Sequence, residues 1–367
     1  MTSVDMHHTP AEALPVQDQG CFFVGGAYVP TRDGPQIRGQ MYVEYHTPAE
    51  DRGKPPIVLI HGKWQSGVNF VSTPDGRAGW ATDFLRRGYP VYVVDQVGRG
   101  RSAAFPDYGG YGLRPYEFTE NMFTGTAAFR LWPGSERHTQ WPGDTGRIGD
   151  AAFDQFAASW IPSLTNPALA EEMNSAALIG LLERIGPAVL LTHSESGAYG
   201  WRVGDARPDL VRAIVATESG MVPFHDIQFI GGSEFYTLSD QMSRPWGLTH
   251  GPLSFEPHLT DANELRAVPH DAPEGPETVR GWVPTTKARL KNLSRLPIGI
   301  VTAEASYHRT FDYLTVEYFR RLGADVDHLE LGRMGVHGNG HMLMLERNSE
   351  QICELLCRWI EERLSAG

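Results

Sequence analysis

The sequence is short of cysteine and of positive charge, and each shortage excludes a class of protein. Only three of the 367 residues are cysteines. Cys353 and Cys357 lie one turn apart on an expected amphipathic helix, and Cys21 is far away in the sequence, so the disulfide framework of a small secreted domain is excluded. The formal net charge is -12 at pH 7, without a cluster of lysine and arginine. This charge argues against nucleic acid or an anionic membrane as a partner, because phosphate surfaces select clustered basic side chains.

Long apolar runs and metal or nucleotide motifs are also missing. No run is long enough to span a membrane, and residues 1–17 lack the apolar centre of a signal peptide. We therefore expect a cytoplasmic protein with a flexible N-terminal segment at 1–20 and a single domain at 21–367. Neither H-E-x-x-H nor C-x-x-C spacing occurs, and the glycines at 25–26 and 98–100 lack the G-x-G-x-x-G spacing. No metal and no cofactor are expected.

The sequence does contain an alternation of apolar runs and amphipathic segments. Its hydrophobic share of 41% is enough for one large core. The runs that predict buried strands occupy residues 56–60, 90–94, 189–192, 210–217 and 296–302. The predicted helices cover residues 79–87, 167–185, 309–322 and 348–364. Strands that alternate with helices predict an α/β fold, with a mostly parallel open sheet flanked by helices on both faces.

Two long segments interrupt this alternation. Residues 103–165 and 219–290 are rich in proline, glycine and aromatic residues, and neither follows a regular strand or helix period. Loops of this length are usually functional when they are ordered. We interpret both segments as insertions in the single domain that form a lid or a pocket wall.

The stretch around Ser194 is the centre of the functional prediction. An apolar run ends at residues 192–196 (Thr-His-Ser-Glu-Ser), and a predicted helix follows. A strand, a sharp turn and a helix in this order expose a serine hydroxyl at the carboxyl edge of a sheet, and the next backbone N–H points at the group under attack. Ser194 is therefore the candidate nucleophile, and the N–H of Glu195 is a candidate oxyanion donor. The usual pattern is G-x-S-x-G, and small hydroxyl residues replace both glycines here.

Other chemically active side chains follow the ends of further predicted strands. His61 and Gly62 follow one strand, Glu218 follows another, Glu304 follows a third, and His341 comes after the last. Ligands bind at the carboxyl ends of the strands in such sheets. The chain order of serine, acid and histidine is also the order expected for a serine nucleophile on this fold. The pattern predicts a serine-hydrolase site.

On these residues the sequence resembles the α/β-hydrolase fold family from about Phe22 to the C-terminus, and more narrowly a bacterial carboxylesterase subgroup whose turn reads Thr/Ser-His-Ser-x-Ser-Gly. The segments shared with the subgroup are residues 22–26, 40–43, 73–77, 95–96, 98–102, 192–197, 335–339 and 341–342. The resemblance implies the α/β-hydrolase fold, esterase chemistry and a glutamate acid at the position of Glu218. Lys63 and Trp64 depart from it, because the related esterase has a cysteine pair there, and the segment between acid and histidine is longer in this chain.

The acid and the base each have an alternative. Glu218 matches the subgroup, whereas Glu304 follows the strand after which most α/β-hydrolases carry their acid, and we prefer Glu218. His341 is preferred as the base, because it precedes the terminal helix. For His337 we expect either a loop hydrogen bond or a place in the pocket lining.

The remaining site predictions concern the oxyanion loop and the pocket. Lys63 or Trp64 is expected to supply the second oxyanion N–H. The candidates for contact with substrate are His61, Tyr199, His337 and Trp246. His308 and His328 are expected at the surface, where most lone histidines lie.

The predicted activity is cleavage of a small-molecule carboxylic ester through an acyl-enzyme. Ser194 attacks, His341 is the base, and Glu218 completes a Ser-His-Glu triad. The alternative is a non-hydrolytic reaction on a bulky metabolite, as in a lyase, a cyclase or an acyl-transfer enzyme. The sequence leaves open whether the chain forms a homodimer.

Overall fold

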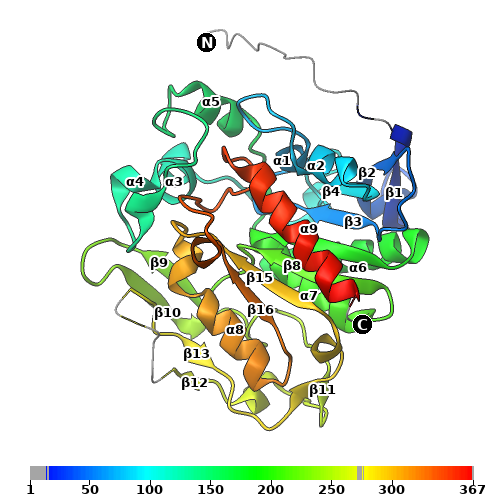
Figure 1. The fold of residues 1–367 in the computed structure, drawn as a ribbon. Helices are drawn as coiled ribbons and strands as arrows, with labels where there is room; N and C mark the ends of the chain where they lie inside the picture. The colour runs from blue at the N-terminus through cyan, green and yellow to red at the C-terminus, as the bar shows by residue number, and fades with distance from the viewer. Residues whose placement is uncertain (1–13, 15, 271–274, 276, 366–367) are drawn as a thin grey trace.

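An eight-stranded sheet forms the centre of the molecule (Figure 1). The structure is a computed structural model that describes residue 14, residues 16–270, residue 275 and residues 277–365. In spatial order its strands are β1 (Val16–Val29), β2 (Gln36–Pro48), β4 (Val91–Asp95), β3 (Ile57–Ile60), β7 (Ala188–His193), β8 (Val211–Thr217), β15 (Ile298–Thr302) and β16 (Asp327–Glu330). The pairings from β4 to β16 are parallel, and β1 and β2 pair antiparallel. The predicted mostly parallel α/β fold is confirmed.

The N-terminal edge of the domain differs from the prediction. β1 begins at Val16, which lies inside the segment 1–20 that was expected to be flexible. Its long antiparallel pairing with β2, which runs from Val16 opposite Pro48 to Val29 opposite Gln36, explains why the strand starts early. Residues 1–13 and 15 of the predicted segment lie outside the described residues.

Helices cover both faces of the sheet. Alternate strand residues point to opposite sides, so that Leu191 of β7 joins one buried cluster and Leu190 the other. On the Leu191 side pack α2 (Trp80–Arg86) and α9 (Ser349–Ser365), the red helix that crosses the sheet in Figure 1. On the Leu190 side pack α6 (Pro167–Ile185) and α7 (Gly197–Ala206), and α8 (Asp312–Arg321) brings Phe319 against Trp201 of α7.

The bounds of α6 follow from its capping residues. The side chain of Asn166 accepts hydrogen bonds from the N–H groups of Ala168 and Leu169, and Pro167 occupies the first turn. Gly186 ends the helix at a φ of 87°, a left-handed value that favours glycine. These are the caps that the sequence indicates, and the predicted range 167–185 is confirmed.

Glycines bring α7 close to the strands that it covers. A Cβ at Gly197 would lie 2.7 Å from Cβ of Ser219, one at Gly200 would lie 2.8 Å from Cγ2 of Thr192, and one at Gly204 would lie 2.8 Å from Cδ1 of Ile214. All three glycines therefore face the sheet. The helix that follows the Ser194 turn can pack tightly because these positions carry no side chain.

The two predicted insertions contain short elements of their own. Residues 103–165 hold β5 (Tyr111–Gly112), α3 (Tyr116–Thr119), a π-helical turn (Glu120–Thr124), α4 (Thr126–Phe129), α5 (Ala151–Ala158) and β6 (Ser163–Leu164). Residues 219–290 hold β9 (His225–Phe229), β10 (Tyr236–Met242), β11 (Phe255–Glu256), β12 (Val268–Pro269), β13 (Trp282–Val283) and β14 (Arg289–Leu290). The only other α-helix in the described part of the chain is α1 (Val68–Val71). Within the described residues, no helix combines the length and apolar character needed to cross a membrane.

The tight contact at Gly197 leads to a stability prediction. We expect Gly197→Ala to lower the free energy of unfolding by about 1–3 kcal/mol, because the new methyl group would press on the backbone and side chain of Ser219. Urea unfolding followed by circular dichroism measures the change. The matched control is Gly180→Ala within α6, where the nearest heavy atom to a new Cβ is 3.5 Å away. There the gain in helix propensity should stabilise by up to about 1 kcal/mol, and equal destabilisation by both changes would contradict the close packing of α7.

Candidate active site

Ser194 lies in a strained turn between β7 and α7. Its φ of 54° is left-handed, which is uncommon for a residue with a side chain and is typical of functional turns. The hydroxyl of Ser196 accepts a hydrogen bond from the N–H of His193 and donates one to the carbonyl of Ile60 at 2.8 Å. Thr192 Oγ1 lies 2.9 Å from Ser219 Oγ. The hydroxyl residues that replace the usual glycines thus tie this turn to the neighbouring strands.

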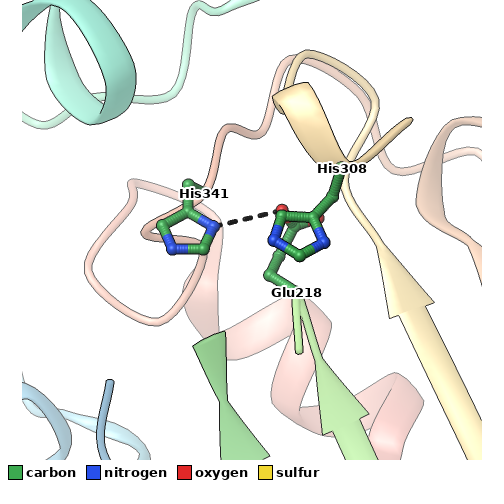
Figure 2. A group of neighbouring side chains, drawn as sticks. All are labelled: Glu218, His308 and His341. Carbon is green, nitrogen blue, oxygen red and sulfur yellow. Dashed lines mark hydrogen bonds and ion pairs between the residues drawn. The ribbon is translucent and has the colours of Figure 1, made fainter. Parts of the chain in front are cut away.

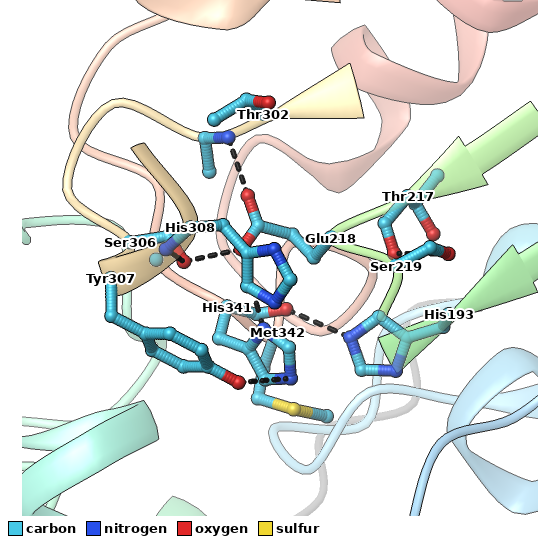
Figure 3. Close-up of polar contacts among 12 residues, drawn as sticks. His193, Thr217, Glu218, Ser219, Thr302, Ser306, Tyr307, His308, His341 and Met342 are labelled. Carbon is cyan, nitrogen blue, oxygen red and sulfur yellow. Dashed lines mark hydrogen bonds and ion pairs between the residues drawn. The ribbon is translucent and has the colours of Figure 1, made fainter. Parts of the chain in front are cut away.

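His341 and Glu218 meet beside this turn. The Nδ1 atom of His341 lies 3.3 Å from Oε2 of Glu218, and both side chains are at most 1% exposed. Glu218 follows β8 at a φ of 50°, and its Oε1 accepts a hydrogen bond from the N–H of Ala303 at 2.6 Å. Its Oε2 also accepts the Ser306 hydroxyl (Figure 3). Both oxygens therefore act as acceptors, which favours the ionised carboxylate even though burial raises the pKa of Glu218.

Aromatic rings enclose the imidazole of His341. Its centroid lies 4.8 Å from that of Phe123, 4.9 Å from that of Tyr307, 4.6 Å from that of His193 and 5.3 Å from that of His308. Burial, with the two neighbouring histidines, lowers the pKa of His341 well below its usual value. The neutral imidazole is therefore the favoured form, and this form can accept a proton.

His193 supports the loop that carries His341. Its Nε2 atom lies 3.0 Å from the carbonyl oxygen of His341, and the ring is fully buried. A carbonyl oxygen can only accept, so Nε2 carries the proton and donates it. Burial lowers the pKa of His193 to about 3, which keeps this support uncharged.

A second histidine–carboxylate pair packs against the first, and the sequence did not indicate it. His308 was expected at the surface but is fully buried, with Nδ1 2.8 Å from Asp312 Oδ1. Asp312 Oδ2 accepts the Thr302 hydroxyl at 2.6 Å. Burial opposes charge on His308, but the carboxylates of Asp312 and Glu218 outweigh it and raise the pKa of His308. His328, also expected at the surface, is only partly exposed, and its Nε2 lies 3.0 Å from Thr302 Oγ1.

Three of these side chains form a group that could hold a metal ion. One donor atom each from Glu218, His308 and His341 lies within 4.8 Å of the other two (Figure 2). His341 and His308 direct their Nδ1 atoms to Glu218 and Asp312, however, so the contacts present are those of a hydrogen-bonded pair of dyads. That the protein uses no metal stays a prediction.

The alternative acid and the alternative base bind each other. Glu304 Oε1 lies 3.2 Å from Nδ1 of His337, and Oε2 accepts the N–H of Gly338 at 2.9 Å. The His337 side chain is 64% exposed. Glu304 also lines a cavity of about 280 Å³, together with Arg137, Thr302, Ala303, Arg309, Glu330, Gly332 and Arg333. The structure thus brings Glu218 to His341 and Glu304 to His337.

The three predicted oxyanion residues differ in what their N–H groups do. The N–H of Trp64 donates to Ser163 Oγ at 2.7 Å and is therefore already used. Among the described residues the N–H of Lys63 has no hydrogen-bond partner. The N–H of Glu195 lies in the first turn of the 3-10 helix Ser194–Ser196, where backbone donors lack partners within the helix. Lys63 and Glu195 are therefore the better donors.

Arg99 joins the oxyanion loop to the Ser194 turn, a role that was not predicted from the sequence. Its fully buried guanidinium donates to the carbonyl of Gly62 at 3.1 Å and to Glu195 Oε2 at 2.6 Å. Gly62 needs to be glycine, because a Cβ there would lie 2.9 Å from Cβ of Ser194. The signal available in the sequence was an arginine between two glycines, shortly after a predicted strand.

Three of the predicted pocket residues have other roles. His61 Nδ1 bonds the carbonyl of Gly62 at 2.8 Å, and its Nε2 accepts the N–H of Gln96 at 3.0 Å, so no ring nitrogen is left for a substrate. Burial lowers the pKa of His61 to about 4. Tyr199 and Trp246 belong to the core cluster on the Leu190 side of the sheet, away from the ring cluster around His341. The sequence does not tell which side of the sheet each ring faces, and contact of these three residues with substrate stays a prediction.

The first insertion supplies the aromatic side chains on the His341 side. Trp64 stacks on Trp160 at 5.5 Å between ring centroids and meets Phe118 edge-on at the same distance. Phe123 contacts both Trp160 and His341. An apolar wall of this kind suits an apolar group of a substrate.

The first insertion is also bonded to the loop of the histidine. His138 Nε2 lies 2.8 Å from Glu346 Oε1, and both side chains are buried. Glu346 in turn accepts hydrogen bonds from Asn339 Nδ2 at 2.7 Å and from the N–H of Gly340 at 2.9 Å. The insertion and the segment before His341 therefore share one buried carboxylate.

Comparison with known proteins identifies the family. No family model matches the sequence. The chain is 39% identical over 358 residues to a probable secreted lipase, phiG, of a fungal species (strain ATCC 74256), across 97% of this chain and 93% of the relative. It is also similar to a bacterial esterase of known structure, with a TM-score of 0.65, 26% identity, and coverage of 97% of this chain and 99% of the esterase.

These likenesses support the predicted fold family and leave the narrower sequence predictions untested. The resemblance to one carboxylesterase subgroup stays a prediction at the level of its motif. The cytoplasmic location also stays a prediction, since the fungal relative is described as secreted. The extent of the similarity, together with the observed sheet, shows that the chain belongs to the α/β-hydrolase family of esterases and lipases.

Proposed function

We propose that the protein hydrolyses carboxylic esters through an acyl-enzyme on Ser194, with His341 as base and Glu218 as acid. The observation that carries this proposal is the buried 3.3 Å contact between His341 Nδ1 and Glu218 Oε2 next to a serine at left-handed φ. A carboxylate on Nδ1 keeps the proton there and leaves Nε2 as the acceptor that a serine nucleophile needs. Relatives named lipase and esterase support the same chemistry.

The reaction proceeds in two halves. The proton of Ser194 passes to His341 while the serine oxygen attacks the ester carbonyl, and the alcohol leaves as it receives a proton. Water then cleaves the acyl-enzyme with the same base. Glu218 stabilises the imidazolium form of His341 in both halves, since it is held by the N–H of Ala303 and the hydroxyl of Ser306.

The backbone N–H groups of Glu195 and Lys63 stabilise the developing oxyanion. Their spacing depends on contact between two loops, because one donor follows Ser194 and the other follows Gly62. Arg99 holds these loops together through the Gly62 carbonyl and the Glu195 carboxylate. The side chain of Glu195 is thus occupied, which leaves its N–H to the substrate.

The substrate class that we propose is an ester with an apolar acyl group. The rings of Trp64, Phe118, Phe123 and Trp160 form the wall beside His341. Burial of apolar surface contributes roughly 25 cal/mol per Å², so such a wall favours long or aromatic acyl groups over acetyl. The lipase name of the fungal relative agrees with this choice.

Replacement of the nucleophile tests the proposal most directly. Ser194→Ala should lower kcat for p-nitrophenyl butyrate by about 10⁴-fold or more, because no covalent step remains. A fluorophosphonate probe should label the native protein and not the variant. Ser365→Ala, at the exposed end of α9, is the matched control and should keep both properties. Native protein that takes the probe without hydrolysing any ester would favour the non-hydrolytic alternative.

A pair of glutamate variants tests the acid. Glu218→Gln should lower kcat by about 10²- to 10⁴-fold, because an amide cannot stabilise the imidazolium and can reverse the tautomer of His341. Glu304→Gln should stay close to the native rate, since its carboxylate bonds His337 and Gly338. Steady-state kinetics with thermal unfolding as a check on folding separates the two, and full activity in Glu218→Gln would refute the assignment.

The lowered pKa of His341 predicts the pH profile. The base works in its neutral form, so kcat/KM is fully present above the pKa of the free enzyme's histidine and is lost as the pH falls through it. Because burial lowers this pKa, the acid limb should lie below the ordinary histidine value of about 6.5. His337→Asn should leave the limb in place. A limb above pH 7, or one that His337→Asn removes, would contradict the prediction.

A further inference from the structure

Glu346 lies directly behind the loop that carries the proposed base. Its side chain is fully buried, and its carboxylate accepts hydrogen bonds from the two residues that precede His341. The N–H of Gly340 lies 2.9 Å from Oε1 and 3.1 Å from Oε2, and Asn339 Nδ2 donates to Oε2 at 2.7 Å. The carboxylate therefore holds one of these residues by its backbone and the other by its side chain.

The same loop is bound to the segment that holds the acid. The carbonyl of Asn339 accepts a hydrogen bond from the N–H of Ala305 at 2.8 Å. Ala305 lies between Ala303 and Ser306, the two residues that donate to Glu218. The place of this loop thus decides how the imidazole of the base lies relative to the carboxylate of the acid.

His138 of the first insertion is a further donor to Glu346. Its Nε2 lies 2.8 Å from Oε1 of the carboxylate, and its Nδ1 lies 3.0 Å from Thr126 Oγ1. A carboxylate oxygen accepts, so Nε2 carries the proton and donates it. The His138 side chain is 1% exposed. Removal of this buried donor would leave part of the carboxylate without its partner, which is costly inside a protein.

The backbone of the first insertion also follows the loop of the base. The N–H groups of Thr139 and Gln140 donate to the carbonyl of Gly338 at 3.0 and 3.2 Å, and the N–H of Arg347 donates to the carbonyl of Gln140 at 2.8 Å. The insertion and the loop are therefore in contact over several residues, and His138 is the side chain that joins this contact to the carboxylate.

On the basis of the proposed function, we propose that Glu346 is a positioning residue for His341 and that His138 makes this positioning depend on the first insertion. The proton still passes directly from Ser194 to His341. Glu346 acts only through the backbone before the base, and it sets where the imidazole lies relative to Ser194 and Glu218. A displacement of about 1 Å at a reacting group can lower a rate by about 10²-fold.

Glu346→Gln tests the positioning role. In either orientation the amide turns an NH₂ group toward a donor, so the loop should shift and kcat for p-nitrophenyl butyrate should fall by about 10- to 100-fold, with little change in KM. The rate of labelling by a fluorophosphonate should fall by a similar factor, because labelling also needs a correctly placed base.

Glu171→Gln is the matched control. Glu171 of α6 is also a buried carboxylate that accepts two backbone N–H groups, those of His250 and Gly251, each at 2.8 Å. Its replacement should reduce stability to urea about as much as Glu346→Gln does, since both leave buried donors poorly matched. It should leave kcat and the labelling rate native, because α6 lies on the opposite face of the sheet from the ring cluster around His341.

Two replacements of His138 test the link to the insertion. His138→Gln keeps an N–H donor close to the place of Nε2 and should stay near the native kcat. His138→Leu removes the donor and should lower kcat by about 10-fold, the effect expected for loss of one hydrogen bond to a charged group. Combined with Glu346→Gln, His138→Leu should lower kcat by less than the product of the single effects, because both changes break the same contact.

The outcomes separate this inference from the proposed function. Native kcat in Glu346→Gln, with a loss of stability equal to that of Glu171→Gln, overturns the positioning role. Equal losses of kcat in His138→Gln and His138→Leu overturn the link to the insertion. If Glu346→Gln does not fold by circular dichroism, His138→Leu decides, since a native labelling rate in that variant overturns both parts. Ester hydrolysis that survives Ser194→Ala would instead refute the acyl-enzyme itself.

Discussion

The contact between His341 and Glu218 is the interaction on which the rest of the site depends. It joins residues 123 positions apart in the sequence, and both side chains are at most 1% exposed. An ionised carboxylate in such a place is stable only when hydrogen bonds replace its hydration. Ala303 and Ser306 supply these bonds, and both come from the segment after β15. The sheet edge therefore has to bring three strand ends together before the acid can carry charge.

The surrounding histidines set how the site handles protons. His193 is neutral and holds the backbone of His341, whereas His308 pairs with Asp312 and lies parallel to His341 at an interplanar angle of 8°. The two neighbours act in the same direction on His341, because each disfavours a positive charge on it. Stabilisation of the imidazolium then falls mainly to Glu218. This balance favours a base that stays neutral until the transition state forms.

The sequence predicted the strands, the helices and the triad candidates better than the side chains that pack around them. Apolar runs and the cap at Asn166 indicate strands and helices through short-range rules, and strand ends indicate Ser194, Glu218 and His341. Tyr307 and His308 were missed because they lie in a 3-10 turn, where no period says which side chain faces inward. The direction of the Tyr199 side chain could not be predicted for a related reason, since it depends on which face of α7 packs on the sheet.

The buried pair of His138 and Glu346 means that substrate choice and catalytic geometry share a support. In many enzymes a variable insertion can be exchanged while the reacting groups stay in place. Here the carboxylate that fixes the backbone before His341 also receives a side chain from the insertion. New specificity could therefore arise by substitution of the rings within residues 103–165 more readily than by replacement of the whole segment. A transplanted insertion would need its own histidine, or an equivalent hydrogen-bond donor to Glu346, to keep His341 in position.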